Sequence, residues 1–189
     1  IGHILIKIEK ILDKINPDAF LVLGDTNSCL CAIVAKKKKI PIFHMEAGNR
    51  CFDFRVPEET NRKIVDHISD INLPYSNIAR EYLINEGISP DRIIKTGSPM
   101  YEVIKYNMSK IKSSTIMADL KLKKQKYFVV SAHREENVEN PKSLKKLIDS
   151  LEKIIDVYGH RIIFSTHPRT RKSIKKNKFK INSKISLLN

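Results

Sequence analysis

The sequence predicts an α/β fold built on parallel sheets, and three observations support this prediction. Short apolar runs of strand length recur along the chain, amphipathic segments with a helical period separate them, and turn residues lie between the two. Because each strand is followed by a helix, neighbouring strands can pair in parallel, with helices on both faces of the sheet. At 189 residues the chain has room for one domain or two small ones.

The first hundred residues predict an opening helix and four strand and helix pairs. Apolar residues recur at helical spacing between Ile1 and Ile15, which predicts an amphipathic helix. The run AFLVL is continuous, as in a strand buried on both faces. Gly87 is typical of a helix end, and Ser98 followed by Pro99 is typical of a helix start. The predicted strands cover residues 19–23, 40–44, 70–74 and 92–97, with helices beginning near residues 29, 59, 76 and 98.

The second half of the chain predicts a shorter repeat of the same pattern. A polar, lysine-rich segment is followed by the predicted strands YFVVSAH and RIIFSTH, with a long helix between them and a short helix over residues 170–176. The last dozen residues carry weak signals, and the lysine-rich tail is compatible with either order or disorder. We therefore expect a first unit over residues 1–108, a connecting segment over 109–126 and a second unit over 127–189. Neither half predicts a complete doubly wound sheet.

Composition limits the kind of protein. The net charge is +14, and residues 169–184 are basic without an acidic residue. This charge either solvates the surface or binds a polyanion. The lysines have helix-surface spacing and no interleaved aromatic residues, which favours the first explanation. The sequence shows no apolar run of membrane length, no leader and no paired C-x-x-C cysteines, so we expect a cytoplasmic protein with reduced thiols.

Polar residues follow four of the predicted strands. Asp25 follows the first, His44 and Glu46 end the second, and His133 and His167 end the two strands of the second half. Each has a simpler explanation, such as a helix cap for Asp25 or a core-edge position for His133. Further acids, Glu58 and Glu59, are also typical of a first helical turn. Because parallel strands place their carboxyl ends on one edge of a sheet, we predict a site there.

The residue types indicate proton transfer. Several carboxylates and a histidine occur without a serine or cysteine nucleophile motif, and crowded carboxylates separate one another's pKa values into an acid and a base. Arginines nearby, such as Arg50, can grip a diphosphate. A metal site is not predicted, because His44-Met45-Glu46 matches half of a zinc deaminase signature and the P-C-x-x-C half is missing.

With these residues in view, the chain resembles the non-hydrolysing UDP-N-acetylglucosamine 2-epimerase family. The resemblance rests on GDTNS, HMEAGNR, RVPEETNR, TGSP and SAHREEN, in family order over essentially the whole chain. Within the family the chain looks closest to the branch that forms UDP-N-acetyl-L-fucosamine for surface polysaccharides. The resemblance implies Rossmann-like parallel sheets in a two-domain arrangement of the GT-B type, with both domains incomplete here.

The resemblance also implies a reaction and roles for residues. Such an enzyme removes the C2 proton of a UDP-N-acetylhexosamine, expels UDP from C1 and adds it back with C2 inverted, without a cofactor. By motif, the catalytic residues are Asp25, Glu46, Glu58 and His133. The implied substrate-binding residues are Arg50, Arg134 and Asn137. Family members are usually homodimers, and the resemblance implies neither a nucleic acid nor a membrane as partner.

The chain departs from the family pattern at both ends. It begins at Ile1, without the basic substrate-contacting segment of the family, and it ends before the family's S-G-x-x-x-E-E motif. We therefore expect a fragment that is inactive alone. The alternative function is a basic module that binds nucleic acid or another polyanion through residues 169–184, which steeply salt-dependent binding would reveal.

Overall fold

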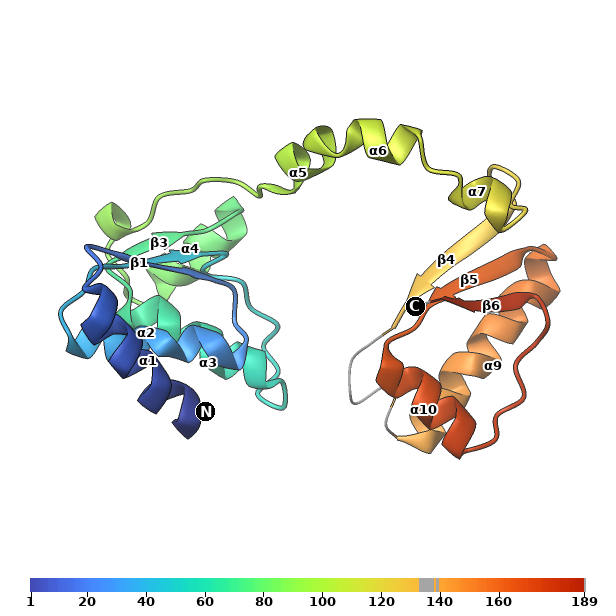
Figure 1. Cartoon of the computed structure of the whole chain (residues 1–189), viewed down its shortest axis with the longest axis horizontal. Helices are drawn as coiled ribbons and strands as arrows, with labels where there is room; N and C mark the ends of the chain where they lie inside the picture. The colour runs from blue at the N-terminus through green and yellow to red at the C-terminus, as the bar shows by residue number, and fades with distance from the viewer. Residues whose placement is uncertain (133–137, 139, 189) are drawn as a thin grey trace. The chain divides into compact units, whose positions relative to one another are not determined.

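The computed structural model describes residues 1–132, 138 and 140–188. The chain divides into two compact units, Ile1–Met108 and Ser109–Asn189, coloured from blue to green and from yellow to red in Figure 1. Each unit has its own three-stranded parallel sheet. The α/β class and the parallel strands that the sequence predicts are therefore confirmed, and the two units are described separately below.

The first unit is built on a sheet in which strand order follows the sequence. Its strands are β1 (Phe20–Leu23), β2 (Ile42–Met45) and β3 (Ile71–Leu73), in the order β1-β2-β3. Val22 lies opposite His44, and His44 lies opposite Asn72. Since the three strands run in one direction, the loops that follow them emerge at a single edge of the sheet.

Helices cover the face of this sheet that carries Val22 and Ile42. The unit contains α1 (Gly2–Ile15), η1 (Asn27–Leu30), α2 (Cys31–Lys37), α3 (Pro57–Ile68), α4 (Asn77–Asn85) and η2 (Pro90–Arg92). Leu12 of α1, Ala35 of α2 and Val65 of α3 pack with Val22 and Ile42 in one buried cluster. Figure 1 shows α1, α2 and α3 side by side beneath the sheet. Burial of these apolar side chains is the main force that holds the helices in place.

The opposite face of β1 differs from the prediction. Strand residues alternate between faces, and Leu21 and Leu23 are 64 % and 62 % exposed. On the same side of the neighbouring strand, Phe43 and Met45 are half-buried. The continuous apolar run therefore does not mark a strand buried on both faces in this structure, because α1, α2 and α3 pack only on the other side.

The fourth predicted strand is also absent from the described sheet. Residues 92–97 make a single parallel bridge, between Ile93 and Asn72, and the Ile94 N–H donates to the Asn72 carbonyl over 2.9 Å. The segment therefore follows β3 without forming a regular strand. The next helix, α5 (Met100–Tyr106), begins after Pro99, and the Ser98 hydroxyl accepts a hydrogen bond from its first N–H.

The predicted connecting segment contains helical structure. Two short helices lie in or next to it, α6 (Met108–Lys112) and α7 (Ile116–Asp119). The polar composition of residues 109–126 is compatible with exposed helices as well as with a linker, because neither helix buries a residue.

The second unit repeats the parallel arrangement. Its elements are β4 (Tyr127–Ser131), α9 (Pro141–Tyr158), β5 (Arg161–Ser165), α10 (Pro168–Lys176) and β6 (Ile185–Leu188), with strand order β4-β5-β6. Leu151 and Ile155 of α9 pack on Ile162 and Phe164 of β5. Residues 185–188, for which the sequence leaves disorder open, are ordered, because β6 pairs with β5 and Ile185 is buried.

Candidate active site

Two of the predicted catalytic carboxylates lie at the carboxyl edge of the first sheet. Asp25 follows β1 by two residues, and Glu46 follows β2 directly. Tyr75 follows β3 at the same edge, after Pro74. Helix α3 presents a buried polar face beside them, which includes Asn61 and Arg62. This arrangement brings groups from three strand ends and one helix together, as the edge rule predicts.

Arg62 connects the two carboxylate loops. Its Nη2 atom pairs with Asp25 Oδ2, while its Nη1 atom donates to the Glu46 carbonyl and lies 3.7 Å from Glu46 Oε1. The Arg62 side chain is only 8 % exposed, so water weakens these interactions little. One guanidinium therefore contacts the side chain of Asp25 and both the main chain and the side chain of Glu46.

The loop after β1 is fixed by contacts of its main chain. Asn61 Nδ2 donates to the Asp25 carbonyl over 2.9 Å and to Asn27 Oδ1 over 3.2 Å. A Cβ atom on Gly24 would lie 3.5 Å from Glu46 Oε2, so the glutamate carboxylate passes close to this glycine. The φ angle of +78° at Gly24 explains the glycine before Asp25, and the two hydrogen bonds explain the asparagine on the facing turn of α3.

Glu46 has an unusual backbone and a partly open side chain. Its φ angle is +64°, a left-handed conformation that costs energy for a residue other than glycine and that clusters at functional sites. Asn49 Nδ2 donates to Glu46 Oε1 over 3.3 Å, and the side chain remains 35 % exposed. Burial and the Glu46 charge raise the pKa of Tyr75, which places that phenol in the same electrostatic environment. The carboxylate is thus oriented and still accessible to a ligand.

Glu58 is not joined to this cluster. It lies exposed in the first turn of α3, and none of the contacts described for the chain links it to Asp25 or Glu46. Its neighbour Glu59 is buried instead and accepts a hydrogen bond from the Cys51 N–H over 2.9 Å. Although burial opposes ionisation, the Cys51 hydrogen bonds and the Lys63 charge lower the pKa of Glu59. The catalytic role of Glu58 stays a prediction.

Arg50 is engaged in internal ion pairs. Its Nε and Nη2 atoms donate to the two carboxylate oxygens of Glu86 over 2.8 and 2.6 Å, and its Nη1 atom lies 2.8 Å from Asp66 Oδ2. The Arg50 side chain is fully buried. Although burial disfavours its charge, hydrogen bonds to Glu86 and the Asp66 charge raise the pKa of Arg50. In this structure the Arg50 guanidinium contacts Glu86 and Asp66. Its role in binding substrate stays a prediction.

Asp66 and His44 extend the network beneath the site. The His44 ring is completely buried, with Nε2 3.0 Å from the Gly24 carbonyl and Nδ1 2.8 Å from Asp66 Oδ1. Asp66 also accepts hydrogen bonds from the Gly48 N–H over 3.2 and 3.3 Å. The loops that carry Asp25 and Glu46 are therefore connected through one buried histidine as well as through Arg62.

The predicted residues of the second unit are only partly within the described structure. His133, Arg134 and Asn137 lie outside the described residues, so their roles stay predictions. His167 caps α10, and its Nδ1 accepts a hydrogen bond from the Arg169 N–H over 3.3 Å. This contact is the helix-capping arrangement, with histidine in the place of a more usual polar cap.

Sequence reasoning missed Arg62, Asn61 and Asp66 as members of the site. All three lie on the buried face of α3, where an amphipathic helix normally carries apolar residues. The sequence does contain a signal for them. Arg62 lies three residues before the apolar Val65 and four before Asp66, so at helical spacing all three fall on the face that packs on the core. Such a position requires a buried partner, which is typical of a site or a structural network.

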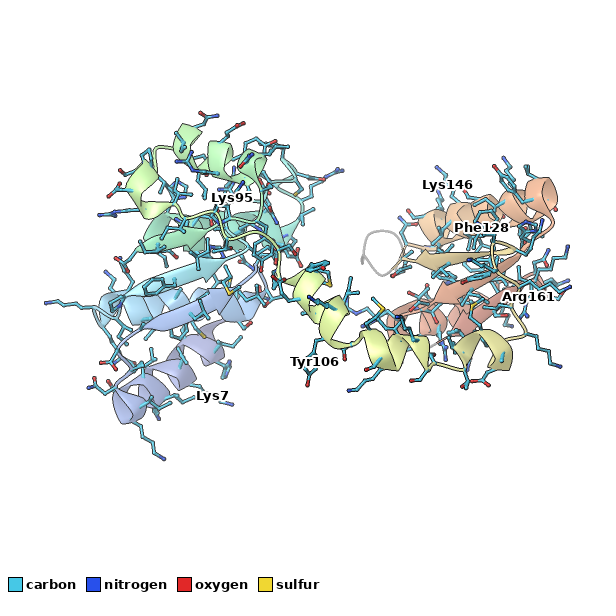
Figure 2. All side chains as sticks on the ribbon, turned by 90° about the horizontal axis from the view of Figure 1, so that it is seen from above. Lys7, Lys95, Tyr106, Phe128, Lys146 and Arg161 are labelled. Atoms are coloured by element: carbon cyan, nitrogen blue, oxygen red, sulfur yellow. The ribbon has the colours of Figure 1, made fainter. Side chains whose placement is uncertain are left out.

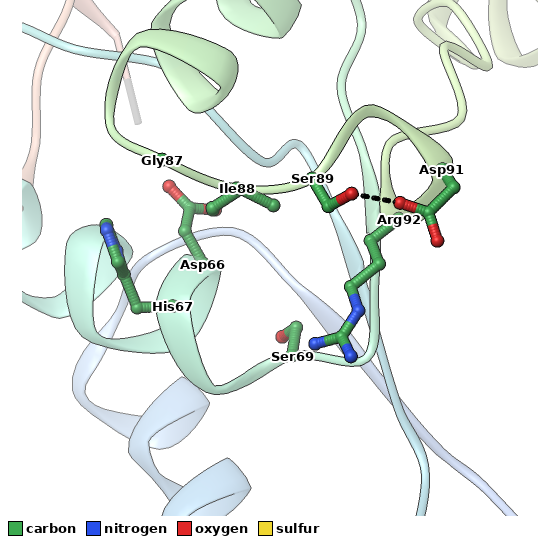
Figure 3. A pocket seen from close by; sticks show the side chains of 8 residues that line it. All are labelled: Asp66, His67, Ser69, Gly87, Ile88, Ser89, Asp91 and Arg92. Atoms are coloured by element: carbon green, nitrogen blue, oxygen red, sulfur yellow. Dashed lines mark hydrogen bonds between the residues drawn. The ribbon is translucent and has the colours of Figure 1, made fainter.

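A separate pocket of about 350 Å³ lies in the first unit (Figure 3). Its lining residues are Asp66, His67, Ser69, Gly87, Ile88, Ser89, Asp91 and Arg92. Ser69 precedes β3 and Arg92 precedes Ile93, so the pocket lies toward the amino ends of the strands. The hydroxyl of Ser89 is bonded to the Asp91 carboxylate, as Figure 3 shows. The pocket is therefore distinct from the edge that carries Asp25 and Glu46.

Metal ligands and membrane spans were also considered for the described residues. Across residues 1–132, 138 and 140–188, no three His, Cys, Asp or Glu side chains are grouped to hold a metal ion. In the same part of the chain, the helices are all too short or too polar to cross a membrane.

The fold and the site together define an α/β protein of Rossmann-like units with paired carboxylates and an arginine at the carboxyl edge of a parallel sheet. A family model described as UDP-N-acetylglucosamine 2-epimerase matches residues 1–189. The chain therefore belongs to the UDP-N-acetylglucosamine 2-epimerase family, as its motifs indicate.

Known proteins agree with this assignment. The chain is 39 % identical over 195 residues to the UDP-N-acetylglucosamine 2-epimerase of Methanocaldococcus jannaschii, covering 99 % of this chain and 53 % of that protein. It is 32 % identical to the UDP-2,3-diacetamido-2,3-dideoxy-D-glucuronate 2-epimerase of Pseudomonas aeruginosa, covering 97 % and 51 %. The chain thus spans about half the length of the curated relatives it matches.

Solved structures show the same fold. The UDP-N-acetylglucosamine 2-epimerase from Rickettsia bellii has a TM-score of 0.90 and 50 % identity, covering 100 % of this chain and 50 % of that one. The M. jannaschii enzyme in complex with UDP-GlcNAc and UDP has a TM-score of 0.88 and 38 % identity, covering 99 % and 53 %. These matches confirm the prediction of Rossmann-like parallel sheets of the GT-B type.

Proposed function

We propose that this chain carries the proton-transfer centre of a UDP-N-acetylhexosamine 2-epimerase. The observation that carries the proposal is the pair of carboxylates, Asp25 and Glu46, brought to one sheet edge and joined by Arg62. Family membership and the relative solved with UDP-GlcNAc and UDP support a UDP-sugar as the ligand. Nothing in these comparisons favours a nucleic-acid function for the basic run at 169–184.

The geometry fits the chemistry of C2 inversion. A proton must leave one face of C2 and return to the opposite face, which requires acid and base groups that differ in protonation state. Asp25 and Glu46 follow adjacent strands and share Arg62, so two candidate groups for the acid and the base lie at one sheet edge. Asp25 is held by Arg62 and Asn61, whereas Glu46 is the more exposed of the two.

Further roles complete the proposal. By motif, we assign His133 a role near the diphosphate, Arg134 and Asn137 supporting roles, and Glu58 the role of a third acid. The reaction expels UDP from C1 and adds it back to the 2-acetamidoglycal, and no cofactor takes part.

We place the reaction in the cytoplasm, in the synthesis of precursors for surface polysaccharides such as capsule or O-antigen. A homodimer and a UDP-N-acetyl-L-fucosamine precursor as substrate belong to the same proposal.

The test is binding and proton exchange at C2. The purified chain is titrated with UDP-GlcNAc while amide resonances are recorded, and C2 deuterium incorporation in D₂O is followed by mass spectrometry. We expect shifts in the loops that carry Asp25 and Glu46. Where exchange occurs, Glu46→Gln should slow it about a hundredfold or more, the usual contribution of a general base. Glu102→Gln on the exposed surface of α5 is the matched control.

Two outcomes would contradict the proposal. If millimolar UDP-GlcNAc leaves the resonances of both loops unchanged, the edge is not a UDP-sugar site. If Glu46→Gln and Glu102→Gln behave alike in exchange, Glu46 is not a proton-transfer residue. Binding without exchange would agree with the expectation that this chain is inactive alone.

A further inference from the structure

Asp66 is a buried carboxylate without direct access to the sheet edge. It lies on α3, one helical turn after Arg62, and its side chain is completely buried. Its two oxygens contact three residues of the segment 44–50. Oδ1 lies 2.8 Å from His44 Nδ1, Oδ2 lies 2.8 Å from Arg50 Nη1, and both accept from the Gly48 N–H.

These contacts surround Glu46 in the sequence. His44 precedes it by two residues, and Gly48 and Arg50 follow it by two and four. Glu46 and Gly48 have left-handed φ angles of +64° and +76°. A turn with a strained glutamate needs external contacts to persist, because an L-residue in this conformation costs about 1–2 kcal/mol. Asp66 supplies such contacts on both sides of the strained residue.

The same network reaches the loop of Asp25. His44 Nε2 forms a hydrogen bond with the Gly24 carbonyl, and Gly24 directly precedes Asp25 in the sequence. The imidazole therefore fixes the spacing between the ends of β1 and β2. Arg50 connects the opposite side of the network to Glu86, the C-cap residue of α4 (Asn77–Asn85). All these groups are on one unit, so the arrangement does not depend on the placement of the other.

We propose that Asp66 is the positioning residue that holds Glu46 in place for proton transfer. It acts through His44, Gly48 and Arg50 and does not touch the substrate itself. This inference rests on the proposed function. It states that Asp66, which takes no part in the reaction itself, keeps the loop that carries Glu46 ordered. Replacement by asparagine removes the negative charge that pairs with Arg50, and it leaves the Gly48 N–H one acceptor oxygen where Asp66 offers two.

The chain offers a matched control for Asp66→Asn. Asp70, just after α3, also accepts a hydrogen bond from a backbone amide, that of Ile42, over 2.9 Å. It also pairs with Lys36, and it lies at the amino end of β2, away from Glu46. Asp70→Asn therefore removes a carboxylate with the same kinds of partner, a backbone amide and a basic side chain, but at a position that is 40 % exposed, whereas Asp66 is completely buried.

The experiment compares amide hydrogen exchange and UDP-GlcNAc affinity in the ¹⁵N-labelled chain. For Asp66→Asn we expect the Gly48 amide to exchange about tenfold faster while Ile42 keeps its protection, and the affinity to fall about tenfold. For Asp70→Asn we expect the reverse pattern of exchange and an affinity within about twofold of the original. Equal loss of protection at both amides of Asp66→Asn, with unchanged affinity, would show a merely structural role and overturn the proposal.

Two further outcomes separate this proposal from the one on which it rests. If the original chain does not bind UDP-GlcNAc, the proposed function fails, and the exchange of Gly48 still decides whether Asp66 orders the loop. If Asp66→Asn does not fold, Glu86→Gln is used. It weakens the hold on Arg50, and because Glu86 is partly exposed we expect this variant to fold. We then expect faster Gly48 exchange and weaker binding, and no change in either quantity would overturn the proposal.

Discussion

Arg62 and Asp25 form an ion pair that joins helix α3 to the loop after β1. The arginine is nearly buried, whereas the aspartate keeps 23 % of its side chain exposed. The pair holds one of the proposed proton-transfer groups at a fixed place on the sheet edge. Because Arg62 also bonds the Glu46 carbonyl, any change in this arginine alters both loops together.

We expect Arg62→Met to destabilise the first unit by about 3 kcal/mol, because it leaves Asp25 with an uncompensated charge. Lys36→Met, at an exposed pair in which Lys36 and Asp70 are 41 % and 40 % exposed, should cost at most about 1 kcal/mol. Urea unfolding followed by circular dichroism measures both. Equal losses in the two variants would contradict the importance of the Arg62 pair.

Gly48 is expected to tolerate no side chain. A Cβ atom there would lie 2.3 Å from the Ala79 carbonyl oxygen, and its φ angle is +76°. Gly48→Ala should therefore destabilise the unit by more than about 3 kcal/mol, because α4 must move away. Gly87→Ala, where φ is +90° and no atom lies within 4 Å, should cost only about 1–2 kcal/mol. Thermal unfolding of the two variants tests the difference, and a smaller loss at Gly48 would refute the close approach of α4.

Glu46→Gly should separate stability from function. Glycine relieves the left-handed backbone, so the free energy of unfolding should not decrease and should rise by up to about 1 kcal/mol, while UDP-sugar chemistry is lost. Lys39→Gly, at another left-handed position with φ +62°, should give a similar gain without loss of binding. Chemical denaturation and a UDP-GlcNAc titration provide the two readouts. A large loss of stability in Glu46→Gly would mean that its side-chain contacts outweigh the strain.

The Arg50 and Glu86 pair predicts a pH dependence. Hydrogen bonds from Arg50 lower the pKa of Glu86 in the folded chain below its ordinary value of 4.5. The unfolded chain therefore takes up the proton at a higher pH than the folded one. The stabilisation is complete above the ordinary value and is lost as the pH falls through the lowered one.

Unfolding by urea between pH 7 and about pH 3 tests this dependence. The original chain should lose stability below about pH 4.5, and Glu86→Gln should start less stable at pH 7 and change less over the acidic range. Glu59 and Asp70, whose pKa values are also lowered, contribute in the same direction in both proteins. Parallel curves for the two proteins would exclude Glu86 as a source of the effect.

The sequence predicts the parts of the site that follow strands. Asp25 and Glu46 can be placed on one edge because apolar runs precede them and parallel strands share their carboxyl ends. Arg62 and Asp66 cannot be placed in the same way, because a charged residue on a helix normally faces water. Their burial becomes visible only when α3 packs on the sheet.

The limits of the fold prediction have similar physical causes. Residues 92–97 contain the apolar residues of a strand, yet they pair with β3 at a single bridge, at Ile93. The segment over 185–188 carries few signals of its own and becomes a strand because β5 offers it a partner. In both cases pairing with a neighbouring strand decides whether a strand forms. The intrinsic strand propensity of the residues is the weaker influence.

The exposed face of β1 has a consequence for the chain in solution. Leu21 and Leu23 lie on a strand whose outer edge has no partner in the described sheet. Unpaired edges next to apolar side chains promote self-association, whereas a net charge of +14 keeps copies apart. Salt screens the repulsion and leaves the apolar attraction intact. The colloidal stability of this chain should therefore fall as ionic strength rises.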